Sequence, residues 1–144
     1  MKNNDNLALD NQLCFALYSA SLAMTQQYRQ YLEPLGLTYT QYSIMLTLWE
    51  QDSVSLKHIA DRLGQKSGSL TPVIKRMEAD GFVTRVRGLN DDRSLSIKLT
   101  KTGNSLKEQG LVINQCIAEA CGISSLKIDA LRENLVDLKR NLTK

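Results

Sequence analysis

The feature that most constrains the fold is a pair of short helical segments joined by a tight turn. Apolar residues recur at steps of three and four over residues 56–63, and Gly64 ends that segment. A second segment begins near residues 67–69 and runs to Asp80. Its Pro72 is expected in the first turn, where a missing N–H is tolerated. This pattern predicts a helix-turn-helix, whose second helix enters the major groove of DNA.

Two segments of alternating apolar and polar residues follow directly, at residues 82–87 and 94–99. Turn-forming residues occupy the stretch between them, and alternation on both sides of a turn predicts a β-hairpin. A hairpin placed after a helix-turn-helix is a wing. The fold class is therefore mainly α with a small β wing, a winged helix-turn-helix.

Long helical segments flank this central unit. The first is expected over residues 10–32, with Asp10 as its N-cap, and the next begins after Thr38 and ends near Glu50. Thr100 is expected to cap a second long helix, and a last helix spans residues 124–142. At 144 residues, one domain is expected.

Charge is unevenly distributed along the chain. Residues 57–107 hold eleven Lys or Arg against five Asp or Glu, whereas the rest of the chain holds seven against ten. A basic middle between acidic ends suggests a localised face for a polyanion, although a merely solvated basic surface gives the same count.

Several classes of function lack the residues that they need. No apolar run is long enough to span a membrane, and residues 1–10 lack a signal-peptide core, so a cytoplasmic protein without membrane contact is expected. Three cysteines without C-x-x-C spacing indicate neither a disulfide framework nor a zinc site. His58 is the only histidine, and no metal or other cofactor is expected.

Polar side chains at the start of the second helix suit contacts with DNA. Base edges and phosphates are the expected partners of four of them, Ser67, Ser69, Thr71 and Lys75. Three arginines suit the phosphate backbone: Arg76, Arg85 and Arg87. Arg93 at the hairpin is expected to enter a minor groove, with Asp91 orienting its guanidinium; the alternative is a hairpin that is simply salt-bridged.

Two patterns now give a resemblance to a known family. Residues 91–103 read D-x-R-x(5)-L-T-x-x-G, which resembles the wing signature of the multiple-antibiotic-resistance regulator (MarR) family. Further matches at residues 13–20, 35–42 and 67–72, with Tyr28, are similar to its organic-hydroperoxide-resistance branch. The likeness covers about residues 9–103.

The resemblance implies a homodimeric repressor that leaves its operator, a pseudo-palindromic DNA duplex, when an organic hydroperoxide oxidises a cysteine. The sensor position maps to Cys14, and the two tyrosines that hydrogen-bond to it map to Tyr28 and Tyr39. Residues 1–35 and 104–144 would form the dimerisation part, and about 38–103 the DNA-binding part. Gln65-Lys66 departs from the family pattern, so the operator preference stays open.

The spacing on the first helix predicts that the sensor site is shared between two subunits. Tyr18 lies four residues after Cys14 and shares its helix face, which makes it a third thiolate-stabilising candidate. Tyr28 lies fourteen residues after Cys14, about 21 Å along a helix axis. It cannot reach its own Cys14, but antiparallel pairing about a two-fold axis brings it to the partner's.

The remaining cysteines are candidate resolving residues. Cys116 and Cys121 are five positions apart and face different sides of a helix, so they are not expected to pair with each other. In the two-cysteine members of the branch a second cysteine joins the oxidised sensor of the partner subunit. Cys121, beside Gly122, is favoured over Cys116 for this role; simple packing is the alternative for each.

Two rival functions remain for comparison. In one, a phenolic or other small anionic ligand releases the DNA, and Cys14 is a small buried hydrophobe. In the other, the chain is a thiol peroxidase, which needs a catalytic Arg or Thr that no motif here supplies. The chain is therefore expected not to be an enzyme.

Overall fold

The computed structural model describes residues 5–87 and 95–144. Its elements, in chain order, are η1 (Leu9–Asn11), α2 (Leu13–Leu32), η2 (Glu33–Leu35), α3 (Tyr39–Glu50), β1 (Val54–Ser55), α4 (Leu56–Leu63), α5 (Ser67–Ala79), β2 (Val83–Arg87), β3 (Leu95–Leu99), α6 (Lys101–Ser105), α7 (Lys107–Ala120) and α8 (Ser125–Leu142).

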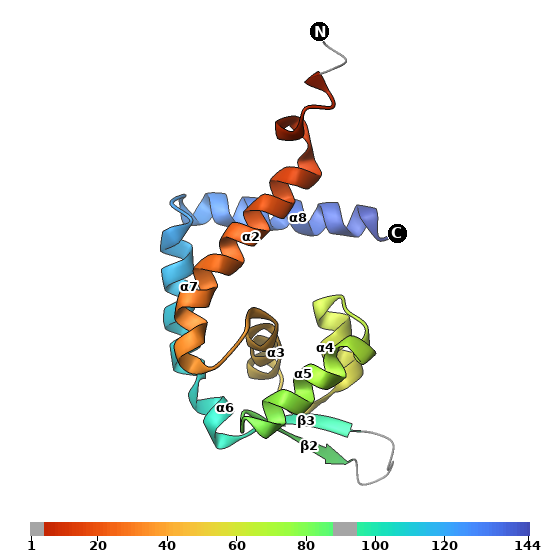
Figure 1. Ribbon diagram of the computed structural model, residues 1–144, viewed down its shortest axis with the longest axis vertical. Coiled ribbons are helices and arrows are strands. Elements are labelled where there is room, and N and C mark those ends of the chain that lie inside the picture. The colour runs from red at the N-terminus through yellow and green to blue at the C-terminus, as the bar shows by residue number, and fades with distance from the viewer. Residues whose placement is uncertain (1–4, 88–94) are drawn as a thin grey trace.

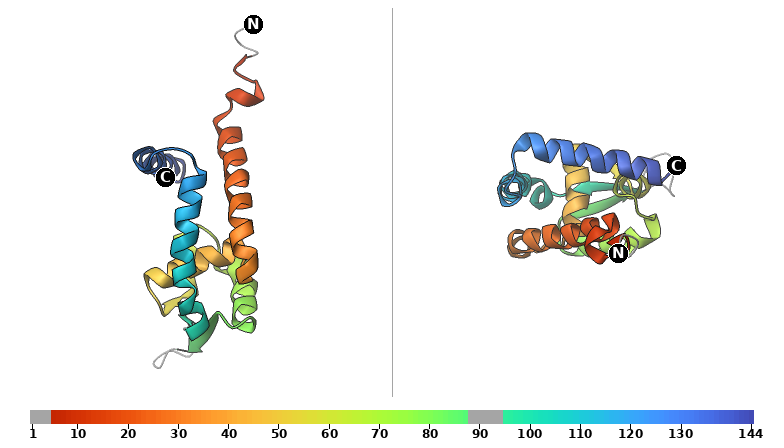
Figure 2. Two further views of the ribbon diagram at one scale, coloured as in Figure 1. Left: turned by 90° about the vertical axis from the view of Figure 1, so that its left-hand side faces the viewer. Right: turned by 90° about the horizontal axis from the view of Figure 1, so that it is seen from above.

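The molecule has two parts that share α2 and α7 as their connection. These two helices run side by side, and α8 crosses at the end that is remote from the sheet (Figures 1 and 2). Helices α3 to α5 and strands β2 and β3 gather at the other end. This arrangement confirms the predicted fold class, a mainly helical winged helix-turn-helix.

Side-chain caps set the beginnings of α3, α4, α6 and α8 where the sequence predicted helix starts. The Thr38 hydroxyl accepts a hydrogen bond from the Gln41 backbone N–H at 3.2 Å, and the Gln41 side chain accepts one from the Thr38 N–H at 3.0 Å. This reciprocal capping box satisfies two N–H groups that a helix start leaves unpaired. The hydroxyls of Ser55, Thr100 and Ser124 each accept a hydrogen bond from one backbone N–H at the start of α4, α6 and α8, without the reciprocal bond.

The wing belongs to a three-stranded antiparallel sheet. The order of the strands is β1-β3-β2, and Ile97 of β3 lies opposite both Val54 of β1 and Arg85 of β2. Strand β1 has two residues and was not predicted, because so short a segment has no readable alternation and gains its partner only from β3.

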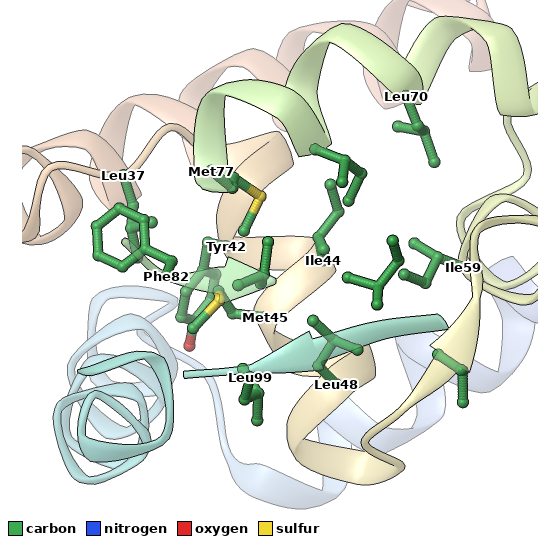
Figure 3. Close-up of a cluster of buried hydrophobic side chains, with 14 of the residues drawn as sticks. Leu37, Tyr42, Ile44, Met45, Leu48, Ile59, Leu70, Met77, Phe82 and Leu99 are labelled. Carbon is green, nitrogen blue, oxygen red and sulfur yellow. The ribbon is translucent and has the colours of Figure 1, made fainter. Parts of the chain in front are cut away.

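Buried apolar side chains of α3, α4, α5 and the sheet form the core (Figure 3). Tyr42, Met45 and Leu48 of α3 face Ile59 of α4 and Leu70 of α5, and all of them are almost completely buried. The core therefore fixes the angle between α4 and the recognition helix α5.

Three local predictions are wrong. Asp10 lies in the 3-10 turn η1, and α2 begins at Leu13 with Gln12 as an N-cap that makes no side-chain hydrogen bond. Pro72 lies well inside α5, not in its first turn, because α5 begins already at Ser67. The second long helix is interrupted at Leu106, which separates α6 from α7.

Within the part of the chain that the structure describes, no single helix has the length and apolar character to cross a membrane. Only the bent pair Lys101–Ala120 and Ser125–Leu142, whose axes meet at 96°, passes that test of length and composition as a pair.

Candidate functional site

Helix α5 presents a small, polar surface outward. Leu70, Ile74 and Met77 face the core, whereas Ser69 and Lys75 are exposed and Ser67 and Thr71 are half-buried. The Thr71 hydroxyl donates to the Ser67 carbonyl at 3.1 Å, so its proton is used within α5. Lys66, the N-cap, makes no side-chain hydrogen bond to the helix, so the positive end of α5 remains open to a phosphate.

Ion pairs restrain two of the arginines predicted to contact phosphates. The Arg76 Nε lies 3.1 Å from an Asp80 carboxylate oxygen on the exposed side of α5. Arg85 is held more firmly, because its backbone N–H and its Nε donate to the two carboxylate oxygens of Glu78 at 3.0 and 2.9 Å. The backbone and side-chain hydrogen bonds from Arg85 lower the pKa of Glu78. The sequence analysis did not predict a role for Glu78. Glu78 lies in α5 and Arg85, seven residues later, lies in β2, so no single helical or strand periodicity pairs them.

Of the three other residues predicted to act at the wing, the structure describes only Arg87. Arg87 ends β2 and is exposed. Asp91 and Arg93 lie outside the described residues, so their predicted pairing and their minor-groove contact remain predictions.

The predicted sensor Cys14 and the predicted tyrosine Tyr28 lie at opposite ends of α2. Cys14 and Tyr18 are exposed near its beginning, and Tyr28 is near its end. Because α2 is one continuous helix from Leu13 to Leu32, the estimated separation of about 21 Å between positions 14 and 28 holds within one chain.

Tyr28 and Tyr39 are brought together, as the prediction that they share a site requires. Their ring centroids are 5.1 Å apart, and Tyr42 adds a third ring at 5.6 Å from Tyr28. Burial, followed by the neighbouring Tyr39, Tyr42 and Cys121, raises the pKa of Tyr28 to about 12. The phenol of Tyr28 therefore stays protonated at neutral pH and remains a hydrogen-bond donor. Tyr42 had no predicted role.

The two later cysteines differ in their surroundings. Cys121 is half-buried at the end of α7 and lines a hollow of about 320 Å³ between α2 and α7, together with Met24 and Gln27 of α2. Cys121 is also the last of the neighbouring groups that raise the pKa of Tyr28. Cys116, also half-buried, does not line this hollow.

A broad apolar surface on α2, α7 and α8 has no partner among residues 5–87 and 95–144. Helix α8 has 18 residues and buries none of them, and α2 buries only Leu32 among its 20. A helix gains most of its stability by packing an apolar face, which α8 does not do here. The exposed apolar residues of these helices are Leu13, Tyr18, Leu22, Met24, Leu111, Val112, Leu126, Leu131, Leu135, Val136 and Leu142.

Comparisons with known proteins point to DNA-binding regulators. A family model described as the transcriptional regulator SarA/Rot matches residues 26–109. The organic hydroperoxide resistance transcriptional regulator of Bacillus subtilis is 41% identical over 138 residues, which are 96% of this chain and 94% of that protein.

Solved structures of a staphylococcal regulator are also similar. The structure of reduced AbfR bound to DNA has a TM-score of 0.80 at 34% identity and is covered in full by the full length of this chain. Disulfide-formed AbfR has a TM-score of 0.67 at the same identity, over 99% of this chain and 94% of that one. AbfR comes from Staphylococcus epidermidis.

Proposed function

Because the chain belongs to the organic-hydroperoxide-resistance branch of the MarR family of winged helix-turn-helix transcription regulators, we propose that it represses transcription while Cys14 is reduced and leaves its operator when an organic hydroperoxide oxidises Cys14. The protein is a DNA-binding regulator that works as a homodimer, not an enzyme. It acts on DNA in the cytoplasm.

The observation that carries the proposal is the tyrosine pair at the far end of α2. Tyr28 and Tyr39 adjoin each other, and Tyr28 is about 21 Å from its own Cys14. The unpartnered apolar face of α2 supports pairing with a second α2, and antiparallel pairing about a two-fold axis brings each Cys14 to the tyrosines of the other subunit. Tyr18, exposed on the same face as Cys14, joins that shared site.

The chemistry needs a thiolate. Protonated phenols donate hydrogen bonds to the negative sulfur and so stabilise the thiolate form of Cys14. The thiolate attacks the outer peroxide oxygen of R–O–O–H and breaks the O–O bond. Sulfur becomes a sulfenic acid, Cys–S–OH, and the leaving alkoxide takes up a proton to become the alcohol. The thiol is oxidised by two electrons and the hydroperoxide is reduced by two.

Oxidation weakens DNA binding through the dimer. A neutral sulfenic acid accepts the phenol hydrogen bonds less strongly than a thiolate does. The change occurs where the two subunits meet, and this interface sets the distance between the two recognition helices. Half-sites of an operator are about 34–36 Å apart, so a change in that distance lowers affinity.

Residues of α5 and residues of the wing are proposed to contact different parts of the DNA. Ser67, Ser69, Thr71 and Lys75 of α5 approach base edges and nearby phosphates in the major groove. The arginines Arg76, Arg85 and Arg87 contact phosphates, and Arg93 with Asp91 follows the minor groove. The basic segment of residues 57–107 supports this face.

The decisive test is DNA binding in two redox states. A labelled duplex, selected by the reduced protein from a random pool, is titrated with the protein before and after treatment with tert-butyl hydroperoxide. We expect binding that weakens at least about tenfold after oxidation and returns with dithiothreitol. Unchanged affinity after oxidation, together with release by a phenolic acid, would instead identify a ligand-controlled repressor.

We expect the Tyr28→Phe substitution to slow the reaction of Cys14. Losing one charge-assisted hydrogen bond destabilises the thiolate by about 1.5 kcal/mol, so alkylation of Cys14 is expected to slow by about tenfold. The time course of Cys14 alkylation by iodoacetamide at neutral pH measures that change. Tyr31→Phe is the matched control, because Tyr31 is a second half-buried tyrosine of α2. Identical alkylation profiles for the wild type and Tyr28→Phe would exclude Tyr28 from the site.

We assign the resolving role to Cys121. Its thiol attacks the sulfenic sulfur of Cys14 of the other subunit, forms the disulfide and releases water. Cys121 lines the hollow between α2 and α7 and Cys116 does not, which supports this choice. After hydroperoxide treatment, we expect a dimer-sized band in non-reducing electrophoresis that Cys121→Ser abolishes and Cys116→Ser retains. A band lost only in Cys116→Ser would reverse the assignment.

A further inference from the structure

The wing rejoins the dimerisation helices through an elbow, residues 100–110, which contains the interruption at Leu106. The Thr100 hydroxyl lies within hydrogen-bonding distance of the backbone carbonyls of Gly81, at 2.6 Å, and Phe82, at 3.1 Å. The Thr100 N–H donates to the same Phe82 carbonyl at 3.1 Å. These bonds fasten α6 to the base of the wing, so a change at the elbow also moves the wing.

Two aromatic side chains of α3 hold the elbow by polar contacts. The Trp49 indole N–H donates to the Gly103 carbonyl at 3.1 Å, and the Tyr42 hydroxyl donates to the Gly110 carbonyl at 3.3 Å. Gly103 lies in the last turn of α6, where helix carbonyls lose their intrahelical partners. The indole therefore supplies a donor at the point where the helix is interrupted.

The packing at the elbow depends on the absence of a side chain at Gly103 and at Gly110. A Cβ added to Gly110 would lie 2.7 Å from the Trp49 ring, and one added to Gly103 would overlap the Phe82 carbonyl. The indole ring therefore lies directly against the backbone of α7. A movement of the indole toward α7 is passed on at this contact, because no gap separates the ring from the backbone of Gly110.

The same two side chains continue a row of rings that begins at the sensor tyrosines. Tyr28 contacts Tyr39 and Tyr42, and Tyr42 meets Trp49 edge-on, with centroids 6.0 Å apart and planes at 75°. Only 2% of Tyr42 is exposed, so its ring is in contact with protein on nearly every side. The row runs without a gap from α2, through α3, to the elbow.

We propose that Tyr42 and Trp49 are positioning residues that couple the redox state of Cys14 to the orientation of the wing and the recognition helix. This inference rests on the proposed function. When oxidation weakens the hydrogen bond between Cys14 and the Tyr28 phenol, the Tyr28 ring shifts, and this displacement passes to Tyr42 and Trp49. Their bonds to the elbow carbonyls shift, and the DNA-binding part turns relative to α7.

The quantity that tests the coupling is the ratio of the dissociation constants for DNA of the oxidised and the reduced protein. Trp49→Phe removes the indole N–H, Tyr42→Phe removes only the hydroxyl, and Gly110→Ala pushes the indole ring from the other side. We expect each substitution to reduce the ratio by about fivefold or more, the smallest change typical of coupling between sites. Oxidation of Cys14, followed by mass spectrometry, proceeds at the wild-type rate.

A merely structural role gives a different result. It weakens both redox states alike, so the ratio stays at the wild-type value, and that outcome in Tyr42→Phe, the most conservative of the three, overturns the inference. Leu46→Ala is the matched control, because Leu46 lies on α3 beside these rings without a polar contact to the elbow. If the wild type itself keeps its affinity after oxidation, the proposed function fails and this inference fails with it.

Discussion

A Cys14→Ser dimer is expected to bind the operator and to stay bound after hydroperoxide is added. Serine has nearly the shape of cysteine, and position 14 is exposed at the start of α2, so the fold and the affinity of the reduced state should change by less than about threefold. The hydroxyl cannot form a sulfenic acid or a disulfide. Fluorescence anisotropy with the selected duplex, before and after tert-butyl hydroperoxide, measures the effect.

Cys116→Ser is the control for this substitution, because it removes another thiol from the same chain and should retain the response to peroxide. Release of DNA from oxidised Cys14→Ser would mean that another residue senses the oxidant. A loss of DNA binding in the untreated variant would mean that Cys14 is required for the dimer itself.

Gly103→Ala is expected to cost about 2–4 kcal/mol of the free energy of unfolding. The added methyl group would overlap the backbone carbonyl of Phe82 and would lie 3.2 Å from a Leu99 methyl carbon. The backbone of Phe82 cannot change rotamer as a flexible side chain can, so α6 has to move away from the base of the wing. Urea denaturation at a fixed protein concentration measures the loss, because dimerisation contributes to the apparent stability.

Gly68→Ala is the matched control for stability. Gly68 also lies in a helix, but nothing lies within 4 Å of an added Cβ there. Alanine inside a helix is preferred over glycine by about 0.5–1 kcal/mol, so this variant should be as stable as the wild type or slightly more stable. Equal stabilities for Gly103→Ala and the wild type would show that the elbow yields easily, and the tight-packing argument would fail.

The helix starts at Thr38 and Thr100 and the helix end at Gly64 were predicted correctly because each depends on chemistry within three or four residues. Two of the features that the sequence did not predict depend instead on contacts between residues far apart in the chain. The interruption at Leu106 goes with contacts from Trp49, more than fifty residues earlier, and β1 exists only because β3 lies beside it. Asp10 has the right side chain for a cap, but α2 begins three residues later.

The sequence alone determined the order of the elements, the basic middle of the chain and the impossibility of a Cys14–Tyr28 contact within one helix, because periodicity, composition and helix rise are local quantities. Only the tertiary structure decided which aromatic rings gather behind Tyr28, that Glu78 restrains Arg85 and that Trp49 rests on the elbow. Those contacts join residues distant in the chain, and their partners follow from how the helices pack, which no short-range pattern encodes.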